Sequence, residues 1–178
     1  MTDIPTIETE RLILRPHTIS DFDAYAAMWR EPGVFRFIGG VAMSREESWT
    51  RLLRTAGVWH FLGFGFLVVE ERSSGRFLGE AGFHDLRRDM HPSPEGSMEA
   101  GWALCHSAQG RGYATEAMRA LLSWAGTHFP HARTTCIIAP DNRPSLNVAD
   151  KLGFRELART VYHDADIILL ELQETAPA

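Results

Sequence analysis

The sequence predicts an α/β fold in which a central mixed, largely antiparallel sheet carries helices on both faces. The first observation is the order of segments with strand or helix character, which reads βααβββαβαβ along the chain. The second is a pair of apolar runs, at 65–71 and 77–83, on either side of the turn Ser73-Ser74-Gly75. That pattern is typical of a hairpin inside a sheet core.

One strand and two helices are expected before this hairpin. Residues 11–15 are short and β-rich, so we expect a strand there. A helix should follow over 21–29 and end at the Pro-Gly pair 32–33. Ser44 and Glu47, three residues apart, form a capping box and predict the start of a second helix.

After the hairpin, three strands should alternate with two helices. A loop rich in proline and glycine comes first, at 87–96. The last helix has an N-cap at Asn142 and a terminating glycine at Gly153. The expected strands are 99–104, 134–139 and 162–172, and the expected helices are 114–125 and the segment between Asn142 and Gly153.

Composition and length fit a single domain over residues 1–178. The content is 44% apolar and 23% charged residues, with no apolar stretch of membrane-spanning length. No secretory signal is seen, so a cytoplasmic location is expected. A formal net charge of −5 with scattered basic residues argues against a nucleic-acid partner. The two cysteines lack CxxC spacing and the histidines lack a third well-spaced ligand, so no metal is expected.

The loop at 109–114 has the character of an anion site. Gly110 and Gly112 allow backbone N–H groups to converge, and the following helix adds the positive end of its dipole. Arg111 is the loop's one basic side chain, so amides would carry most of the binding, as for a nucleotide diphosphate. A dinucleotide fingerprint would need glycine or alanine where Thr115 stands, and no Gly-Lys-Ser/Thr occurs for a Walker loop.

Several segments resemble the GNAT superfamily of N-acetyltransferases. Residues 109–114 match its Gln/Arg-x-x-Gly-x-Gly/Ala signature, and 142–154 match its second cofactor segment, ending in Lys-Leu-Gly-Phe. Residues 9–16, 99–102 and 112–117 look like the RimJ/RimL branch, which acetylates protein N-termini and some small amines. The resemblance covers nearly the whole chain and implies a GNAT fold that uses acetyl-CoA as donor.

The resemblance also implies which residues bind acetyl-CoA. The backbone of Trp102, Ala103 and Leu104 would pair with the pantetheine arm, and Asn142 would hydrogen-bond it. The diphosphate would be held by backbone N–H groups of the loop, which comprises Gly110, Arg111, Gly112, Tyr113, Ala114 and Thr115.

Two residues are expected to carry the chemistry. Glu99 matches the family's strand carboxylate, proposed to take the proton of the acceptor amine, and we expect partial burial to raise its pKa toward that task. Many members place a tyrosine near the leaving thiolate, but the matching position here is Ala149. Ser145 matches the hydroxyl of the RimL-like branch and would stabilise the thiolate by a hydrogen bond. Tyr113 is a weaker candidate for that donor.

These observations predict an enzyme that transfers acetyl from acetyl-CoA to a primary amine in a ternary complex. A protein or peptide N-terminus is the leading acceptor, and a small-molecule amine such as an antibiotic, polyamine or amino acid is the alternative. A catalytically silent acyl-CoA-binding module, suggested by Ala149, and a nicotinamide-linked oxidoreductase are rival hypotheses. We expect a monomer or homodimer without a membrane partner.

Overall fold

A computed structural model describes residues 4–173 of the chain. Its strands are β1 (Ile7–Glu8), β2 (Leu12–Arg15), β3 (Phe66–Glu71), β4 (Arg76–His84), β5 (Met98–Leu104), β6 (Thr134–Ile138), β7 (Phe154–Tyr162) and β8 (Ala165–Leu172). Its α-helices are α1 (Phe22–Met28), α2 (Pro32–Phe35), α3 (Arg45–Leu62), α4 (Tyr113–His128) and α5 (Arg143–Leu152). No helix within residues 4–173 has the length and apolar character needed to cross a membrane.

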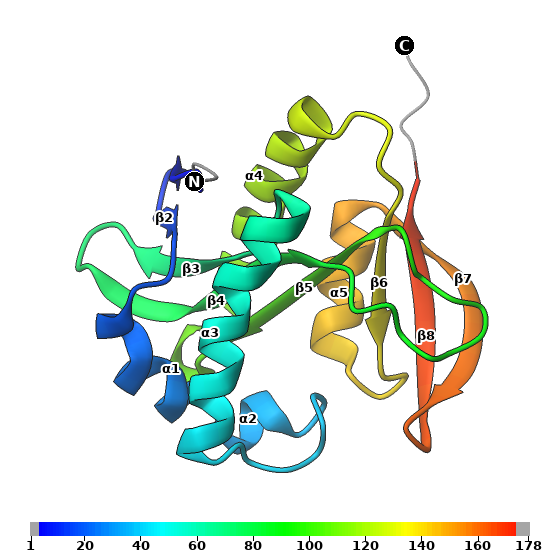
Figure 1. Ribbon diagram of the computed structural model, residues 1–178, viewed down its shortest axis with the longest axis horizontal. Helices are drawn as coiled ribbons and strands as arrows, with labels where there is room; N and C mark the ends of the chain where they lie inside the picture. Colours follow the sequence, from blue (N-terminus) through cyan, green and yellow to red (C-terminus); the bar gives the residue numbers. More distant parts are fainter. Residues whose placement is uncertain (1–3, 174–178) are drawn as a thin grey trace.

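All eight strands belong to one sheet, in the order β1-β2-β3-β4-β5-β6-β8-β7 (Figure 1). Each neighbouring pair is antiparallel except β5 and β6, which run parallel. The predicted mixed, largely antiparallel sheet is therefore confirmed.

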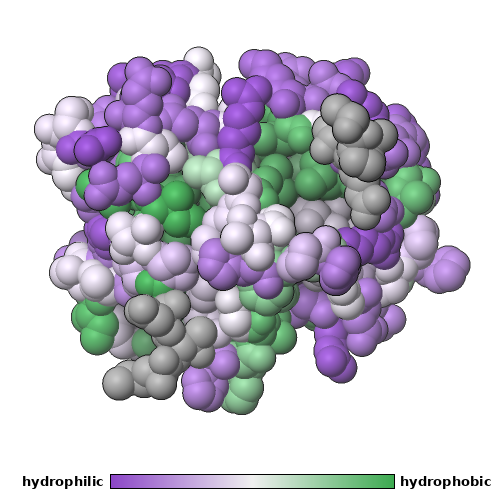
Figure 2. Space-filling model, turned by 90° about the horizontal axis from the view of Figure 1, so that it is seen from above, coloured by the Kyte–Doolittle hydropathy of each residue, from purple (hydrophilic) through white to green (hydrophobic). Residues whose placement is uncertain are grey.

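Helices cover both faces of the sheet, as the sequence predicts. On one face, Met118 and Leu121 of α4 are fully buried against a cluster that includes Phe83 of β4. On the other, Tyr25 of α1 and Leu52 of α3 pack with a second cluster that includes Ala103 of β5. Figure 1 shows α3 crossing in front of the strands. The space-filling view has a largely hydrophilic face with hydrophobic residues recessed between the polar ones (Figure 2).

The capping box at the start of α3 is present. The Glu47 N–H donates to Ser44 Oγ at 3.1 Å, and the Ser44 N–H donates to Glu47 Oε2 at 2.7 Å. Gly63 ends the helix with a φ of +73°, a conformation that glycine adopts without strain. Helix α3 is therefore anchored firmly at both ends above the sheet.

One sequence prediction was wrong, and one strand was missed. Pro32 and Gly33 do not end a helix but begin the short helix α2, because a proline at the first helical position has no N–H to leave unsatisfied. The predicted strand 162–172 is the second strand of a hairpin whose first strand is β7, with His163 and Asp164 in left-handed conformations at the turn. Strand β7 lies at the sheet edge and is largely exposed, so it lacks the apolar run that marks a buried strand.

The sheet opens between β5 and β6. These strands pair only through Met98 with Thr134 and Glu99 with Thr135. Beyond that point β5 continues to Leu104, still paired with β4 on its other side, while β6 turns away to pair with β8. The edge of β5 that faces β6 is consequently without a strand partner from Ala100 onward.

Candidate active site

A cavity of about 840 Å³ lies at this opening. Its walls come from strand β5, from residues 139–141 that follow β6, from the start of α5 and from the side of α3 that faces the sheet. Among its lining residues are Glu99, Ala100, Gly101, Trp102 and Ala103 of β5, His84 of β4, Arg88, Asn142, Ser145 of α5, and Arg51 and Arg54 of α3.

The open edge of β5 fits an extended, amide-bearing ligand. Trp102 and Ala103, predicted to pair with a pantetheine arm, line the cavity through the segment of β5 that has no partner on this side. Unpaired strand edges bind extended chains through backbone hydrogen bonds. Leu104 lies outside the cavity lining, and its carbonyl accepts a 2.9 Å hydrogen bond from the Gln109 side chain. Gln109 thereby ties the glycine loop to the end of β5.

The glycine loop has the backbone geometry of an anion cradle. Gly110 and Gly112 have φ values of +72° and +81°, and Gly112 is the N-cap of α4. The first hydrogen bond of the helix runs from the Glu116 N–H to the Gly112 carbonyl at 3.0 Å. The N–H groups at the start of a helix have no partner within it. Those of residues 110–115 are thus available to an anion, although the loop is not part of the cavity wall.

A polar tether fixes this loop to the β1–β2 turn. Glu116, in the first turn of α4, accepts hydrogen bonds from the Arg11 Nε at 2.6 Å and from the Thr9 hydroxyl at 2.7 Å. Arg11 also donates to the Arg111 carbonyl at 3.0 Å. The tether was not predicted from the sequence, since it joins segments about a hundred positions apart.

Two side chains of the loop serve packing. Tyr113 and Thr115 are buried, and the Tyr113 hydroxyl donates to Glu71 at 2.9 Å. This hydroxyl is therefore engaged away from the cavity, whose lining does not include Tyr113. The Arg111 guanidinium lies 4.9 Å from the centroid of the Tyr113 ring and so contacts an aromatic side chain of the same loop.

Glu99 is buried and held by two cationic or polar side chains. Arg88 donates from Nε to Oε2 and from Nη2 to Oε1, both at 2.7 Å, and the His84 Nε2 lies 2.9 Å from Oε1. Burial by itself would raise the pKa of Glu99, but the hydrogen bonds from His84 and Arg88 outweigh it and lower the pKa from its usual 4.5 to about 2. The expectation of a raised pKa was wrong, because it considered burial without these partners.

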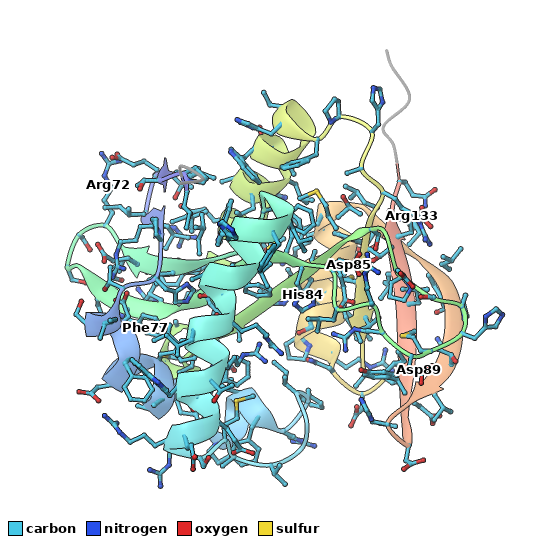
Figure 3. The ribbon with its side chains drawn as sticks, in the orientation of Figure 1. Arg72, Phe77, His84, Asp85, Asp89 and Arg133 are labelled. Atoms are coloured by element: carbon cyan, nitrogen blue, oxygen red, sulfur yellow. The ribbon has the colours of Figure 1, made fainter. Side chains whose placement is uncertain are left out.

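His84 is a site residue that sequence reasoning missed. It stands directly opposite Glu99 in the β4–β5 register, and its side chain is 12% exposed. An ionised carboxylate only accepts hydrogen bonds, so Nε2 of His84 must carry the hydrogen. In the uncharged tautomer this leaves the lone pair on Nδ1, which has no hydrogen-bond partner among residues 4–173. Figure 3 shows His84 in the interior beside α3, whereas Arg72 and Asp89 lie at the periphery.

Asn142 and Ser145 meet the cavity at the start of α5. The Asn142 Oδ1 accepts from the Ser145 N–H at 3.3 Å and so caps the helix. Both residues line the cavity, and the Ser145 hydroxyl makes no hydrogen bond to another residue in the described part of the chain. Ala149 is fully buried in the core, so a tyrosine there would require this core to repack.

Comparisons with known proteins agree with this geometry. The chain matches the GNAT acetyltransferase domain family over residues 11–155. It is similar to a GnaT-family acetyltransferase structure from Bordetella pertussis, with 35% identity, a TM-score of 0.85, and coverage of 96% of this chain and 100% of the other. The uncharacterised N-acetyltransferase p20 of Bacillus licheniformis is 23% identical over 85% of this chain and 83% of its own length.

A more distant structure shares the fold. RimL, the ribosomal L7/L12 α-N-protein acetyltransferase in complex with coenzyme A, has 16% identity, a TM-score of 0.75, and coverage of 94% of this chain and 97% of its own. The family match shows an acyltransferase of a family that uses acetyl-CoA, and the opened sheet with its cavity agrees with it. The chain belongs to the GNAT acetyltransferase family, and ribosomal-protein acetyltransferases of the RimL type are among its structural neighbours.

Proposed function

We propose that residues 1–178 act as one domain that transfers acetyl from acetyl-CoA to the primary amine of a bound acceptor. The observation that carries the proposal is the unpartnered edge of β5, which opens onto the cavity that also holds Glu99, His84 and Ser145. A direct transfer needs the donor and acceptor side by side, and this cavity has walls from both faces of the sheet.

The chain's backbone would hold the donor. Amides of residues 110–115 would bind the diphosphate at the start of α4, and Trp102 and Ala103 would pair with the pantetheine arm. Leu104 would end this pairing, because its carbonyl is already used by Gln109. Asn142 would add a side-chain hydrogen bond from the opposite wall. Once bound, acetyl-CoA supplies the activated acyl group.

His84 and Glu99 together would take the proton of the amine. The Nδ1 of His84 is the free basic atom, and Glu99 holds the ring through Nε2 while its negative charge stabilises the protonated imidazole. Arg88 keeps Glu99 ionised. In this arrangement Glu99 acts through His84, since both its oxygens are occupied.

The Ser145 hydroxyl would donate a hydrogen bond to the departing thiolate. It lies on the α5 side of the cavity, opposite β5, and is not used by another described residue. A serine hydroxyl is too weak an acid to transfer its proton fully, so the contribution would be stabilisation of charge.

The leading acceptor is a protein or peptide N-terminus. The similarity to RimL supports it at the level of fold, and an α-amine with a pKa of about 7.7–8.0 needs little help to lose its proton near neutral pH. A small-molecule amine is the alternative acceptor.

Mass-shift screening of peptides and small amines with acetyl-CoA tests the proposal. The wild type should acetylate at least one acceptor, and Glu99→Gln and Ser145→Ala should lower turnover while coenzyme A still binds. Binding of coenzyme A without acetylation of any amine would favour the silent binding module instead. The family match removes the nicotinamide-linked oxidoreductase from the candidate functions.

A further inference from the structure

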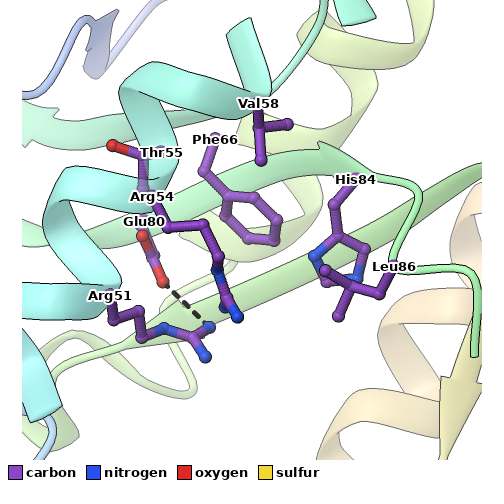
Figure 4. Close-up of a pocket in the computed structure, with 8 residues that line it drawn as sticks. All are labelled: Arg51, Arg54, Thr55, Val58, Phe66, Glu80, His84 and Leu86. Carbon is purple, nitrogen blue, oxygen red and sulfur yellow. Dashed lines mark hydrogen bonds and ion pairs between the residues drawn. The ribbon is translucent and has the colours of Figure 1, made fainter. Parts of the chain in front are cut away.

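A small side pocket extends from the cavity between α3 and β4 (Figure 4). Its volume is about 20 Å³, which is enough for one small polar group. Eight residues line it, and six of them also line the main cavity. They are Arg51, Arg54, Thr55, Val58, Phe66, Glu80, His84 and Leu86.

Two arginines of α3 direct their guanidinium groups into this side pocket (Figure 4). Arg51 is committed to the protein: its Nη2 lies 3.3 Å from Glu80 Oε1 and its Nε donates to the Tyr25 hydroxyl at 3.2 Å. Arg54, three residues further along the helix, has no carboxylate within 4.0 Å among residues 4–173. The side pocket therefore contains one guanidinium charge without a partner.

The surrounding carboxylates compensate the charge of Arg54 only in part. Glu80 is paired with Arg51, and Glu99 is paired with Arg88. Partial burial of the guanidinium, together with repulsion from Arg51 and Arg88, lowers the pKa of Arg54, although the residue as a whole is exposed. A negative group placed between Arg51 and Arg54 would relieve this repulsion.

An amine is protonated in its resting form, so an unpaired guanidinium near the proton acceptor His84 would repel it. We infer that the acceptor is an amine that also carries a carboxylate, and that Arg54, aided by Arg51, binds this carboxylate in the side pocket. The inference rests on the proposed acetyltransferase function and narrows its acceptor. A polyamine, which is positive along its whole length, does not fit this site.

The apolar walls of the pocket suit a short aliphatic spacer. Val58, on the same helix, and Phe66 and Leu86 line the pocket beside the two arginines. A carboxylate on such a spacer has two chemical sources: the α-carboxylate of a free amino acid, or an acidic side chain close to a peptide N-terminus. Arginine binds either of them through the same paired hydrogen bonds.

Matched acceptors separate these sources. One pair is a free amino acid and its amide, and the other is a peptide with aspartate or asparagine at its second position, amidated at the C-terminus. We expect at least about tenfold higher kcat/KM for the charged member of one pair, because hydrogen bonds to charged groups have that strength. The acceptor pair in which kcat/KM depends on the charge shows whether the carboxylate belongs to a free amino acid or to an acidic side chain near a peptide N-terminus.

Substitution of Arg54 tests its role directly. Arg54→Gln should raise KM for the preferred charged acceptor by roughly tenfold to a hundredfold, with kcat and the KM of the neutral partner little changed. Arg45→Gln is the matched control, since Arg45 belongs to the same helix and forms an exposed pair with Asp23 at 2.6 Å. This control should behave like the wild type.

A binding measurement keeps the two proposals distinguishable. Calorimetric titration of the N-acetylated charged product, compared with its neutral amide, should show preferential binding that Arg54→Gln abolishes, whether or not the enzyme turns over. Equal kcat/KM within both acceptor pairs by an active enzyme would overturn the carboxylate site alone. Acetylation of no amine would overturn the proposed function, and the titration would then decide the carboxylate site by itself.

Discussion

Arg88 holds the carboxylate of Glu99 by two hydrogen bonds, one to each oxygen and both 2.7 Å long. Such a two-point contact stabilises the ionised carboxylate, so the pKa of Glu99 falls even though the group is buried. A carboxylate of this kind is a poor proton acceptor near neutral pH. Its role in the site is to supply a negative charge and to orient His84 through a hydrogen bond to Nε2.

The first prediction concerns stability in acid. The folded-state pKa of Glu99 is about 2 against a usual 4.5, so its contribution to stability is complete above pH 4.5 and is lost as the pH falls toward 2. The shift corresponds to roughly 3 kcal/mol. Urea unfolding of the wild type and Glu99→Gln between pH 6.5 and 2.5 should show a shallower pH dependence for the variant. Parallel curves would contradict the pairing.

The second prediction concerns proton removal by His84. His84→Gln should lower kcat/KM at pH 7 by about a hundredfold, within the range usual for general-base catalysis. The deficit should shrink toward pH 9.5, because an α-amine with a pKa of about 7.7–8.0 is then already unprotonated. Pre-steady-state and steady-state rates of the wild type and the variant between pH 7 and 9.5 measure this deficit in kcat/KM. The affinity for coenzyme A, determined separately, should not change.

A role for His84 in positioning alone predicts another result. Loss of packing would lower the rate by the same factor at every pH, and the deficit would not shrink. Phe66, whose ring centroid lies 5.3 Å from that of His84, offers a comparison. Phe66→Leu disturbs the same contact without removing a base, so its deficit should be independent of pH.

The candidate site was only partly predictable from the sequence. The glycines at 110 and 112 need positive φ, which is a local requirement that sequence reveals directly. The pKa of Glu99 was not predictable in this way, because its partners are set by tertiary structure. His84 meets Glu99 through the strand register, and Arg88 reaches it from a segment that reads as an ordinary surface loop.

In the fold, too, local features were predictable from the sequence and features set by tertiary structure were not. Capping residues such as Ser44 and Asn142 act within one helical turn, so the starts of α3 and α5 were predicted correctly. The opening between β5 and β6 depends on the strand order, which brings β8 to the other side of β6. Strand β7 was missed because an exposed edge strand has no need of an apolar run.

The third prediction concerns the backbone of the glycine loop. Gly110 has a φ of +72°, and a Cβ added to it would meet no atom within 4 Å, so Gly110→Ala meets backbone strain and no clash. We expect a loss of roughly 1–2 kcal/mol in the free energy of unfolding and weaker binding of coenzyme A, by calorimetry. Gly126→Ala is the control. Gly126 lies within α4 with open space around it, so alanine there should stabilise by roughly 0.5–1 kcal/mol and leave binding unchanged.

The last prediction concerns the tether between Glu116 and Arg11. Glu116→Gln keeps the shape of the side chain but removes the charge that holds the Arg11 Nε at 2.6 Å, and Arg11 in turn holds the Arg111 carbonyl at 3.0 Å. The pair is partly exposed, so its loss should be worth about 1 kcal/mol. We expect the free energy of coenzyme A binding to weaken by that amount, which corresponds to a roughly fivefold higher Kd. Glu156→Gln breaks a similar exposed pair with Arg159, 2.9 Å long, on β7 and outside the cavity wall, and should leave Kd unchanged. An unchanged Kd in both variants would show that the loop holds its geometry without the tether.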